Sequence, residues 1–213
     1  MGLKNAVLEL IDRETQISKE TGKGRIIAKM NALSEPDAIK ALYRASQAGV
    51  QIDLIVRGIC SLRPGIPGLS ERIKVISIVD RFLEHSRIWY FEAGGKREIY
   101  LSSADWMQRN FVRRVEIAFP VEDPAVKERI VDELLGTALG DNIKARILRP
   151  DGQYERVAPG SHGTGTAPLR SQERFMALAR RTATPEAQAA VASPDMFPST
   201  HRRREPRRKK RIG

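Results

Sequence analysis

The sequence predicts a protein of the α/β class, in which a mixed β-sheet is flanked by helices. Short apolar stretches alternate with amphipathic ones along the first 157 of its 213 residues. Near the start, a strand, a helix and a second strand follow one another with short links, which favours a right-handed crossover and a parallel pair. Glycine- and proline-containing turns farther along indicate hairpins, and therefore antiparallel partners in the same sheet.

The first elements follow from spacing and capping signals. Apolar residues recur at helical intervals over residues 3–18, which predicts an amphipathic opening helix. Residues 25–30 contain adjacent isoleucines and are typical of a short buried strand. Ser34 is a good N-cap and Pro36 is tolerated in a first turn, so a second helix should begin there. Residues 50–56 are then the second apolar strand, parallel to the first.

Antiparallel strands are expected in the middle of the chain. Prolines and glycines punctuate residues 57–72, which we expect to form a loop. Residues 73–79 and 87–92 are strand-like. The glycine pair that follows can supply the positive backbone angles of a hairpin turn into a strand at residues 97–101.

The last elements of the domain are a strand, a helix and a hairpin. Residues 112–121 are rich in apolar and β-branched side chains and predict a strand. Asp123 is an expected N-cap, followed by Pro124 at the first helical position. Residues 143–148 and 153–157 surround a proline- and glycine-containing turn and complete the fold as a hairpin.

The strong positive charge belongs mostly to the end of the chain. The net charge is +11, yet residues 1–157 hold 25 Lys and Arg against 22 Asp and Glu, a net of +3. We therefore expect a folded domain at residues 1–157 and a linker with a candidate terminal helix at residues 158–183. A disordered basic tail should follow at residues 184–213, because so little apolar content cannot offset the ordering entropy.

Composition indicates a cytoplasmic protein. Cys60 is the only cysteine, so no internal disulfide can form, which fits a reducing compartment. No stretch approaches the roughly 18–20 apolar residues of a membrane-spanning helix. Charged residues interrupt the N-terminal segment, which a secretory signal would not tolerate. We expect no membrane span.

Two arginines, a Gly/Pro-rich loop and a histidine fall within about thirty residues and indicate chemistry on a phosphorylated substrate. Arg57 follows a predicted strand at the edge where open α/β sheets bind ligands. Arg63 lies in the loop, and His85 stands beside Arg87 before another strand. Guanidinium groups match phosphate oxygens, and histidine carries protons near neutral pH. The alternatives are a hydrogen-bonded core histidine and arginines paired with surface carboxylates.

A second polar cluster follows the strand at residues 97–101. Ser103, Asn110 and Arg113 offer a hydroxyl, an amide and a guanidinium that suit phosphate contacts. The alternative is a capped turn whose Trp106 simply belongs to the core. Glu116 is expected either to pair with an arginine of this cluster or to face water.

Motifs of other enzyme classes are missing from the sequence. It contains no Walker loop, no dinucleotide-binding glycine motif, no nucleophile elbow and no His/Cys spacing for zinc. No residue is therefore expected to bind a metal ion. His162 and His201 lie in segments predicted to be flexible and are poor catalytic candidates.

Five stretches carry a resemblance to a known family. They are IIAKMN (26–31), AGVQIDLIVRG (48–58), LRPGIPGLS (62–70), RFLEHSR (81–87) and SSADWMQRN (102–110), the last continued by RRVE (113–116). Together they resemble the last catalytic domain of the histidine-phosphorylating polyphosphate kinases. The resemblance covers about 150 residues, to roughly residue 157. The following helix, from residue 171, is a candidate match to the closing helix of that family.

The resemblance implies a fold, an activity and site residues. The family transfers the terminal phosphoryl group of ATP to polyphosphate, reversibly and with Mg²⁺, in domains that resemble phospholipase D. His85 matches a histidine that contacts ATP and assists the transfer, and His85-Ser-Arg87 stands where phospholipase D-like enzymes have His-x-Lys. Arg57 matches an arginine that contacts the nucleotide phosphates. By the same resemblance, Arg63, Arg87, Ser103, Asn110 and Arg113 are candidate ATP- or phosphate-binding residues.

The chain also departs from that family. Family members are several times longer, and the phosphorylated histidine and the Mg²⁺-holding residues lie in a preceding domain that this sequence lacks. A partner chain carrying that domain, or a homo-oligomer, is therefore expected alongside ATP, ADP and polyphosphate. The alternatives are a phospholipase D-like phosphodiesterase and a non-catalytic module whose basic tail binds polyanions.

Overall fold

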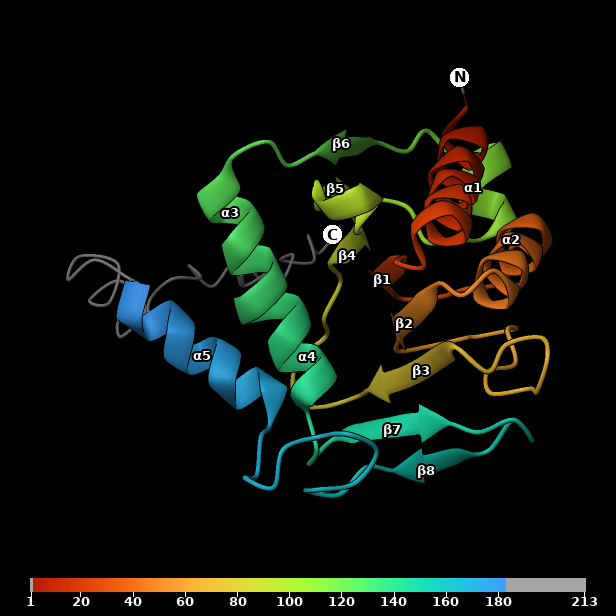
Figure 1. Ribbon diagram of the computed structural model, residues 1–213. Helices are drawn as coiled ribbons and strands as arrows, with labels where there is room; N and C mark the ends of the chain where they lie inside the picture. The colour runs from red at the N-terminus through yellow and green to blue at the C-terminus, as the bar shows by residue number, and fades with distance from the viewer. Residues whose placement is uncertain (1, 183–213) are drawn as a thin grey trace, which may run out of the picture. The chain divides into compact units, whose positions relative to one another are not determined.

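A computed structural model describes residues 2–182, so the predicted disordered tail at residues 184–213 lies outside the described part of the chain. The domain is built on one eight-stranded mixed sheet with the strand order β6, β5, β4, β1, β2, β3, β7, β8 (Figure 1). β1, β2 and β3 are parallel to one another, and the remaining pairs are antiparallel. The mixed sheet flanked by helices confirms the predicted fold class.

The strands are β1 (Arg25–Met30), β2 (Gln51–Val56), β3 (Ile73–Ile78), β4 (Arg87–Phe91), β5 (Glu98–Ser102), β6 (Ala118–Pro120), β7 (Ala145–Leu148) and β8 (Tyr154–Arg156). The α-helices are α1 (Leu3–Thr21), α2 (Pro36–Gln47), α3 (Pro124–Arg129), α4 (Thr137–Gly140) and α5 (Ser171–Thr182). A π-helical segment, Ile130–Gly136, joins α3 to α4. The predicted glycine turn is confirmed, because Gly94 and Gly95 have φ of 67° and 96° between β4 and β5.

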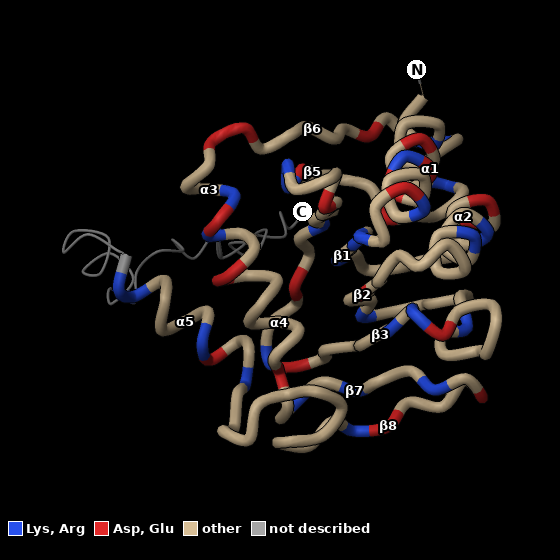
Figure 2. The backbone as a smooth tube through the Cα atoms, in the orientation of Figure 1, with Lys and Arg blue, Asp and Glu red and all other residues tan. Residues whose placement is uncertain are grey.

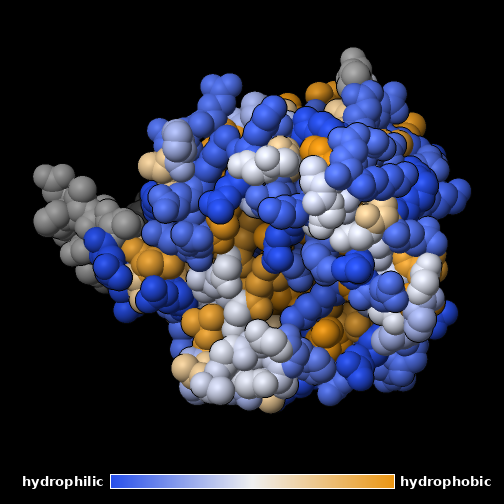
Figure 3. Space-filling view, in the orientation of Figure 1, coloured by the Kyte–Doolittle hydropathy of each residue, from blue (hydrophilic) through white to orange (hydrophobic). Residues whose placement is uncertain are grey.

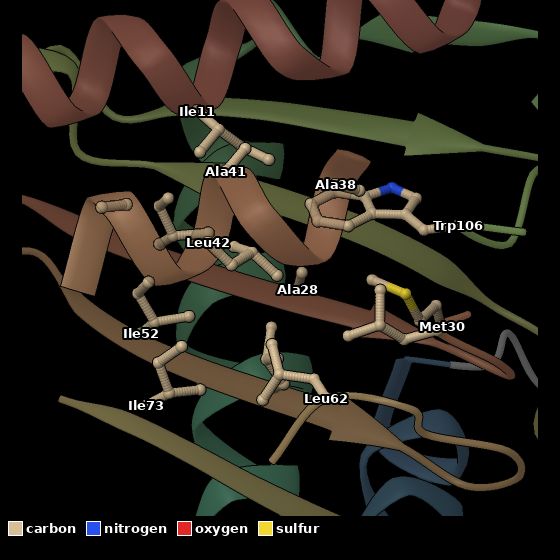
Figure 4. Packing of buried hydrophobic residues seen from close by; sticks show 14 of the residues in the cluster. Ile11, Ala28, Met30, Ala38, Ala41, Leu42, Ile52, Leu62, Ile73 and Trp106 are labelled. Carbon is tan, nitrogen blue, oxygen red and sulfur yellow. The ribbon is translucent and has the colours of Figure 1, made fainter. Parts of the chain in front are cut away.

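Side chains of each central strand alternate between two apolar layers, as the period of a strand requires. In β1, Ile26, Ala28 and Met30 pack in the layer that contains residues of α1 and α2, as Figure 4 shows for Ala28 and Met30. Ile27 packs in the opposite layer, with residues of the helix that runs through α3 and α4. Both faces of the central strands are therefore buried, and their ends are the parts left to carry polar side chains.

The N-cap of α2 differs from the prediction. Glu35, not Ser34, occupies that position, and its carboxylate accepts a hydrogen bond of 2.8 Å from the backbone N–H of Ala38. Lys4 of α1 pairs with the same buried carboxylate at 2.9 Å. A long acidic side chain can cap this helix because a distant lysine neutralises it, and that partnership has no local signal in the sequence.

The strand predicted at residues 112–121 is mostly wrong. The chain forms a π-helical turn, Arg109–Arg113, and only Ala118–Pro120 joins the sheet, as the edge strand β6. Backbone N–H groups of Asn110 and Phe111 both donate to the Met107 carbonyl. The start of this stretch therefore forms a turn, and its backbone does not pair with a neighbouring strand. The predicted cap at Asp123 is confirmed, since its carboxylate accepts from the Val126 N–H at 2.9 Å.

Charges and apolar side chains are distributed differently over the described residues. Lys and Arg are interspersed with Asp and Glu on α1, α2 and α3 in Figure 2, which agrees with the nearly balanced charge of residues 1–157. The face shown in Figure 3 is largely hydrophilic, but apolar residues gather in a hollow near its centre. Among the described residues, no helix is long and apolar enough to cross a membrane.

Candidate functional site

Four chain segments bring polar side chains to one edge of the sheet. Asn31 follows β1 and Arg57 follows β2, and both strands end at this edge because they are parallel. β4 runs antiparallel to β1, so its first residue, Arg87, lies there too. β5 reverses direction again, and Asp105 comes shortly after its end. This is the edge at which open α/β sheets usually bind ligands.

A continuous set of hydrogen bonds joins these side chains. Arg57 Nε donates to Asn31 Oδ1 at 2.7 Å. The backbone N–H and the amide of Asn31 donate to Asp105 Oδ1 at 2.7 and 3.1 Å. Arg87 then donates to both carboxylate oxygens of Asp105, at 3.2 and 3.1 Å. Asp105 thus fixes the orientation of Arg87 directly and of Arg57 through Asn31.

His85 stands at the end of this set, held by Arg87. An Nη1 donor of Arg87 lies 2.8 Å from His85 Nδ1 and 2.7 Å from the His85 carbonyl oxygen. A guanidinium group can only donate, so the imidazole accepts in the contact at Nδ1. The structure therefore links His85 and Arg87, which are close in the sequence, to Arg57.

Asp105 is a buried carboxylate that stays charged. Its side chain is 5% exposed. Burial alone would raise the pKa of Asp105, but the hydrogen bonds from Arg87 and from the Asn31 backbone outweigh it and lower the pKa below its usual value. Sequence reasoning missed Asp105 and Asn31 as members of the site, although both stand within the polar motifs that follow β1 and β5.

Glycine is required next to Arg57 by a close backbone approach. The Gly58 N–H donates to the Asn31 carbonyl oxygen at 2.9 Å. A Cβ atom at Gly58 would lie 2.8 Å from that same oxygen, closer than such atoms approach in proteins. The contact ties the end of β2 to the end of β1 and so brings Arg57 within reach of Asn31.

The second polar cluster forms around a carboxylate of its own. Ser103 Oγ donates to Glu116, and Asn110 Nδ2 donates to the other oxygen of Glu116 at 2.6 Å. The sequence suggested that Glu116 pairs with an arginine or faces water. In the structure it does neither, because its carboxylate accepts hydrogen bonds from Ser103 and Asn110. Trp106 is fully buried and packs edge-on against Trp89. It therefore belongs to the core, which was one of the two interpretations of this cluster.

Like Ser103 and Asn110, the predicted site residues Arg63 and Arg113 lie apart from the set that contains His85. The guanidinium of Arg63 donates twice to the carbonyl oxygen of Pro150, at 2.9 and 2.6 Å. Arg113 is exposed, and its side chain makes no hydrogen bond or ion pair with any described residue. Roles in phosphate binding for Arg63, Ser103, Asn110 and Arg113 stay predictions.

The loop that carries His85 is fastened by the first turn of α5. Gln172 accepts from the Phe82 N–H and donates to the Phe82 carbonyl, both at 2.8 Å, and also donates to Glu84 at 3.0 Å. Lys29 pairs with Glu84 at 3.0 Å from the other side. Arg170 forms two hydrogen bonds with the buried Asp80 and lowers its pKa. Nothing in the local sequence marked these residues.

A pocket of about 670 Å³ lies at the opposite edge of the sheet from His85 and its arginines. It is lined by the glycine-rich turns before β1 and after β4, together with Arg25, Arg72 and Glu92. Arg25 already pairs with Asp53 at 2.7 Å, and Glu92 puts a carboxylate in the lining. The chemistry-bearing histidine and its arginines are not among its lining residues.

A family model and individual relatives point to the same protein family. Residues 1–172 match the model of the polyphosphate kinase C-terminal domain 2. The polyphosphate kinase of Paraburkholderia phytofirmans is 57% identical over 154 residues, which are 72% of this chain and 22% of that protein. The polyphosphate kinase of Halalkalibacterium halodurans is 50% identical over 186 residues, 87% of this chain and 26% of that protein.

A solved structure agrees with the sequence comparisons. The crystal structure of the polyphosphate kinase from Porphyromonas gingivalis superposes with a TM-score of 0.77 at 42% identity, covering 85% of this chain and 28% of that one. The chain thus spans about a quarter of the length of these relatives.

Proposed function

The chain belongs to the polyphosphate kinase family, and on this premise we propose that it binds ATP and polyphosphate and takes part in phosphoryl transfer between them as a C-terminal catalytic domain. The observation that carries the proposal is the continuous set of hydrogen bonds from Arg57 to His85. It holds two guanidinium groups and an imidazole at one edge of the sheet, where a phosphorylated substrate needs them.

Phosphoryl transfer depends mainly on positioning and on neutralising charge. Arg57 uses Nε to contact Asn31, and within the described residues its Nη groups have no hydrogen-bond partner, which leaves them for phosphate oxygens. Arg87 is held on one side by Asp105 and contacts His85 on the other. We assign His85 the role of assisting the transfer at the phosphoryl group, and the two arginines the role of orienting the phosphates.

The described residues do not fit Mg²⁺. No three His, Cys, Asp or Glu side chains gather among them as metal ligands. Both carboxylate oxygens of Asp105 already accept hydrogen bonds from Asn31 or Arg87, so this carboxylate is not free for a cation. In our proposal Mg²⁺ is held by residues of another part of the enzyme, and no step is assigned to it here.

A partner that covers this edge is part of the proposal. Large apolar side chains stand exposed near the site: Ile59, Val79 and Leu83 are 65%, 69% and 73% exposed, and Phe82 is 48% exposed. Contiguous exposed apolar surface is typical of interaction sites. The rest of a polyphosphate kinase, on a separate chain or in a second copy, is the partner we propose. A reducing, cytoplasmic location accords with the single cysteine, Cys60.

The test is ATP-dependent polyphosphate synthesis by the purified chain, alone and with the Paraburkholderia phytofirmans enzyme from which the corresponding domain has been deleted. Alone, the chain should bind ATP or polyphosphate weakly, with an affinity that falls as salt screens its charges, and should show little turnover. With the complementing protein, synthesis should appear. His85→Asn should then reduce the rate by about 100-fold or more, the range expected for loss of a proton-transferring group.

His162→Asn is the matched control, because asparagine tolerates the positive φ of 50° found there. It should leave synthesis unchanged. Robust synthesis by the chain alone that His85→Asn abolishes would mean that His85 itself accepts the phosphoryl group. Absence of ATP and polyphosphate binding in every combination would overturn the proposal.

A further inference from the structure

A pocket of about 390 Å³ opens beside Arg57, which stands at the other end of the hydrogen-bonded set from His85. This size lies within the range of about 300–1,000 Å³ that is common for small-ligand sites. Its lining comes from the end of β2, the end of β3 and the β7–β8 hairpin: Arg57, Gly58, Ser77, Val79, Lys144, Arg146 and Tyr154.

Strand register explains why these side chains face one another. β3 and β7 are antiparallel, and Ser77 is the direct partner of Arg146. β7 pairs with β8 so that Leu148 is opposite Tyr154. Residues two apart on a strand share a face, and directly paired residues share it as well. Arg146, Ser77 and Tyr154 therefore converge on one face of the sheet edge.

The lining of the pocket carries an excess of positive charge. Three of its lining residues are cations and none is a carboxylate. Within the described residues, Arg57 and Arg146 form no ion pair, and Lys144 pairs with Asp80 at the long distance of 3.9 Å. Asp80 is already engaged by Arg170 at 2.7 Å. Cations gathered in a concave site repel one another unless an anion joins them.

The Tyr154 hydroxyl adds a donor of the kind that phosphate oxygens accept. Tyr154 Oη has no hydrogen-bond partner among the described residues, and burial raises the pKa of the phenol, which keeps it a donor. Ser77 Oγ donates to the Arg57 carbonyl oxygen at 3.3 Å, which ties β3 to the residue that the pocket shares with the site.

We propose that this pocket is a second phosphate subsite, which holds a run of linked phosphate groups between Lys144, Arg146 and Arg57. Arg57 borders both the pocket and the set that ends at His85, so one polyanion can contact all of them. The inference rests on the proposed function. It adds Lys144 and Arg146, at the start of β7, as residues that bind the substrate. The phosphates belong either to inorganic polyphosphate or to a nucleoside triphosphate, and the experiment separates these sources.

The experiment measures binding of long-chain polyphosphate and of ATP to the full chain by calorimetry, at several salt concentrations. The double variant Lys144→Gln, Arg146→Gln should weaken binding because it removes two of the three cations of the pocket. The expected loss is about tenfold or more, which corresponds to about 1.4 kcal/mol. It should also reduce the salt dependence, because fewer phosphates are neutralised. Loss with polyphosphate only would identify the polymer as the occupant, and loss with both ligands would identify a run as short as a triphosphate.

A charge-matched control separates this subsite from general attraction. Lys40→Gln, Arg129→Gln removes the same charge from exposed positions on α2 and α3 and should change affinity less than twofold. Both double variants alter exposed or half-exposed side chains, and equal melting temperatures would show that they fold. If Lys144→Gln, Arg146→Gln binds like the control while His85→Asn binds weakly, the subsite is wrong and the proposed function stands. If wild type binds neither ligand, both fail.

Discussion

Asp105 decides the geometry of the candidate site although sequence reasoning assigned it no role. It accepts hydrogen bonds from Asn31 and Arg87, and these two residues in turn orient Arg57 and His85. A buried carboxylate with a guanidinium partner costs free energy to desolvate, so its value lies in placing the arginine. We therefore regard Asp105 as a positioning residue.

Asp105→Asn should destabilise the domain by about 3 kcal/mol at neutral pH, because it leaves Arg87 buried without its counter-charge. The native pKa of Asp105 is lowered, so its contribution is complete above its unfolded value of about 3.9 and is lost as the pH falls through the native pKa. The difference in unfolding free energy between wild type and variant should therefore shrink below about pH 4.

Urea unfolding at a series of pH values measures this difference. Asp132→Asn, an exposed helical position, is the control and should shift the unfolding free energy by less than about 0.5 kcal/mol. A difference for Asp105→Asn that stays constant from pH 7 to pH 3 would contradict the role of its charge.

At the scale of elements, the loop between β3 and β4 depends on α5. The loop carries His85 but lies outside the ladders of the sheet, and Phe82 and Leu83 are among its exposed residues. Gln172 satisfies the backbone N–H and carbonyl of Phe82 with two hydrogen bonds, as a neighbouring strand would in a sheet. The start of α5 is itself held by Asp141, whose carboxylate accepts from the N–H and Oγ of Ser171 at 2.8 and 2.7 Å.

Gln172→Ala should therefore accelerate amide exchange across residues 79–86, most of all at Phe82, whose N–H loses its acceptor. Gln172→Glu keeps an acceptor but loses the donor to Phe82 and adds a charge next to Glu84, so its effect should be intermediate. Hydrogen–deuterium exchange with peptide resolution is the measurement.

Gln16→Ala is the matched control, since its amide contacts only Glu20 along the exposed side of α1. That change should leave exchange in the 79–86 segment as it is in wild type. Equal exchange at Phe82 in wild type and Gln172→Ala would show that the loop is held by other contacts.

At the scale of the whole molecule, hydrogen bonds continue past the domain boundary that the sequence predicts at residue 157. Asn142 donates to the carbonyl oxygens of Gly165 and Ala167 at 2.9 Å and accepts from the Leu169 N–H at 2.7 Å. Phe175 packs against the apolar layer that includes Val157. These contacts tie residues 158–175 to the sheet, and the boundary itself stays a prediction.

Limited proteolysis should leave a resistant fragment that ends near residue 175, because cleavage before it requires these hydrogen bonds to open. Mass spectrometry of the fragment gives its end directly. Recovery of a stable fragment that ends near residue 157 would instead support the boundary predicted from periodicity and turn signals.

The sequence by itself determined most of the strands and showed that Arg57 and Arg87 stand at strand ends. It did not determine residues 112–121, where a π-helical turn replaces most of the predicted strand. A run of apolar residues is a local property, so it marks a strand whose two faces are both buried. Parallel strands end at one edge, which brings polar residues such as Arg57 to the end of the sheet where open α/β folds bind ligands, without knowledge of their partners. The turn at Gly94 and Gly95 was equally visible, because only its local backbone angles matter.

Only the tertiary structure decided which side chains meet. Asn31 bonds to Asp105 across 74 positions, and Gln172 to Phe82 across 90. Lys144 and Arg146 face Arg57 because β7 adds to β3 in one particular register. The physical reason is that periodicity specifies a face, whereas a hydrogen-bond partner is set by how distant segments close on one another. A pairing of that kind leaves no pattern in either segment alone.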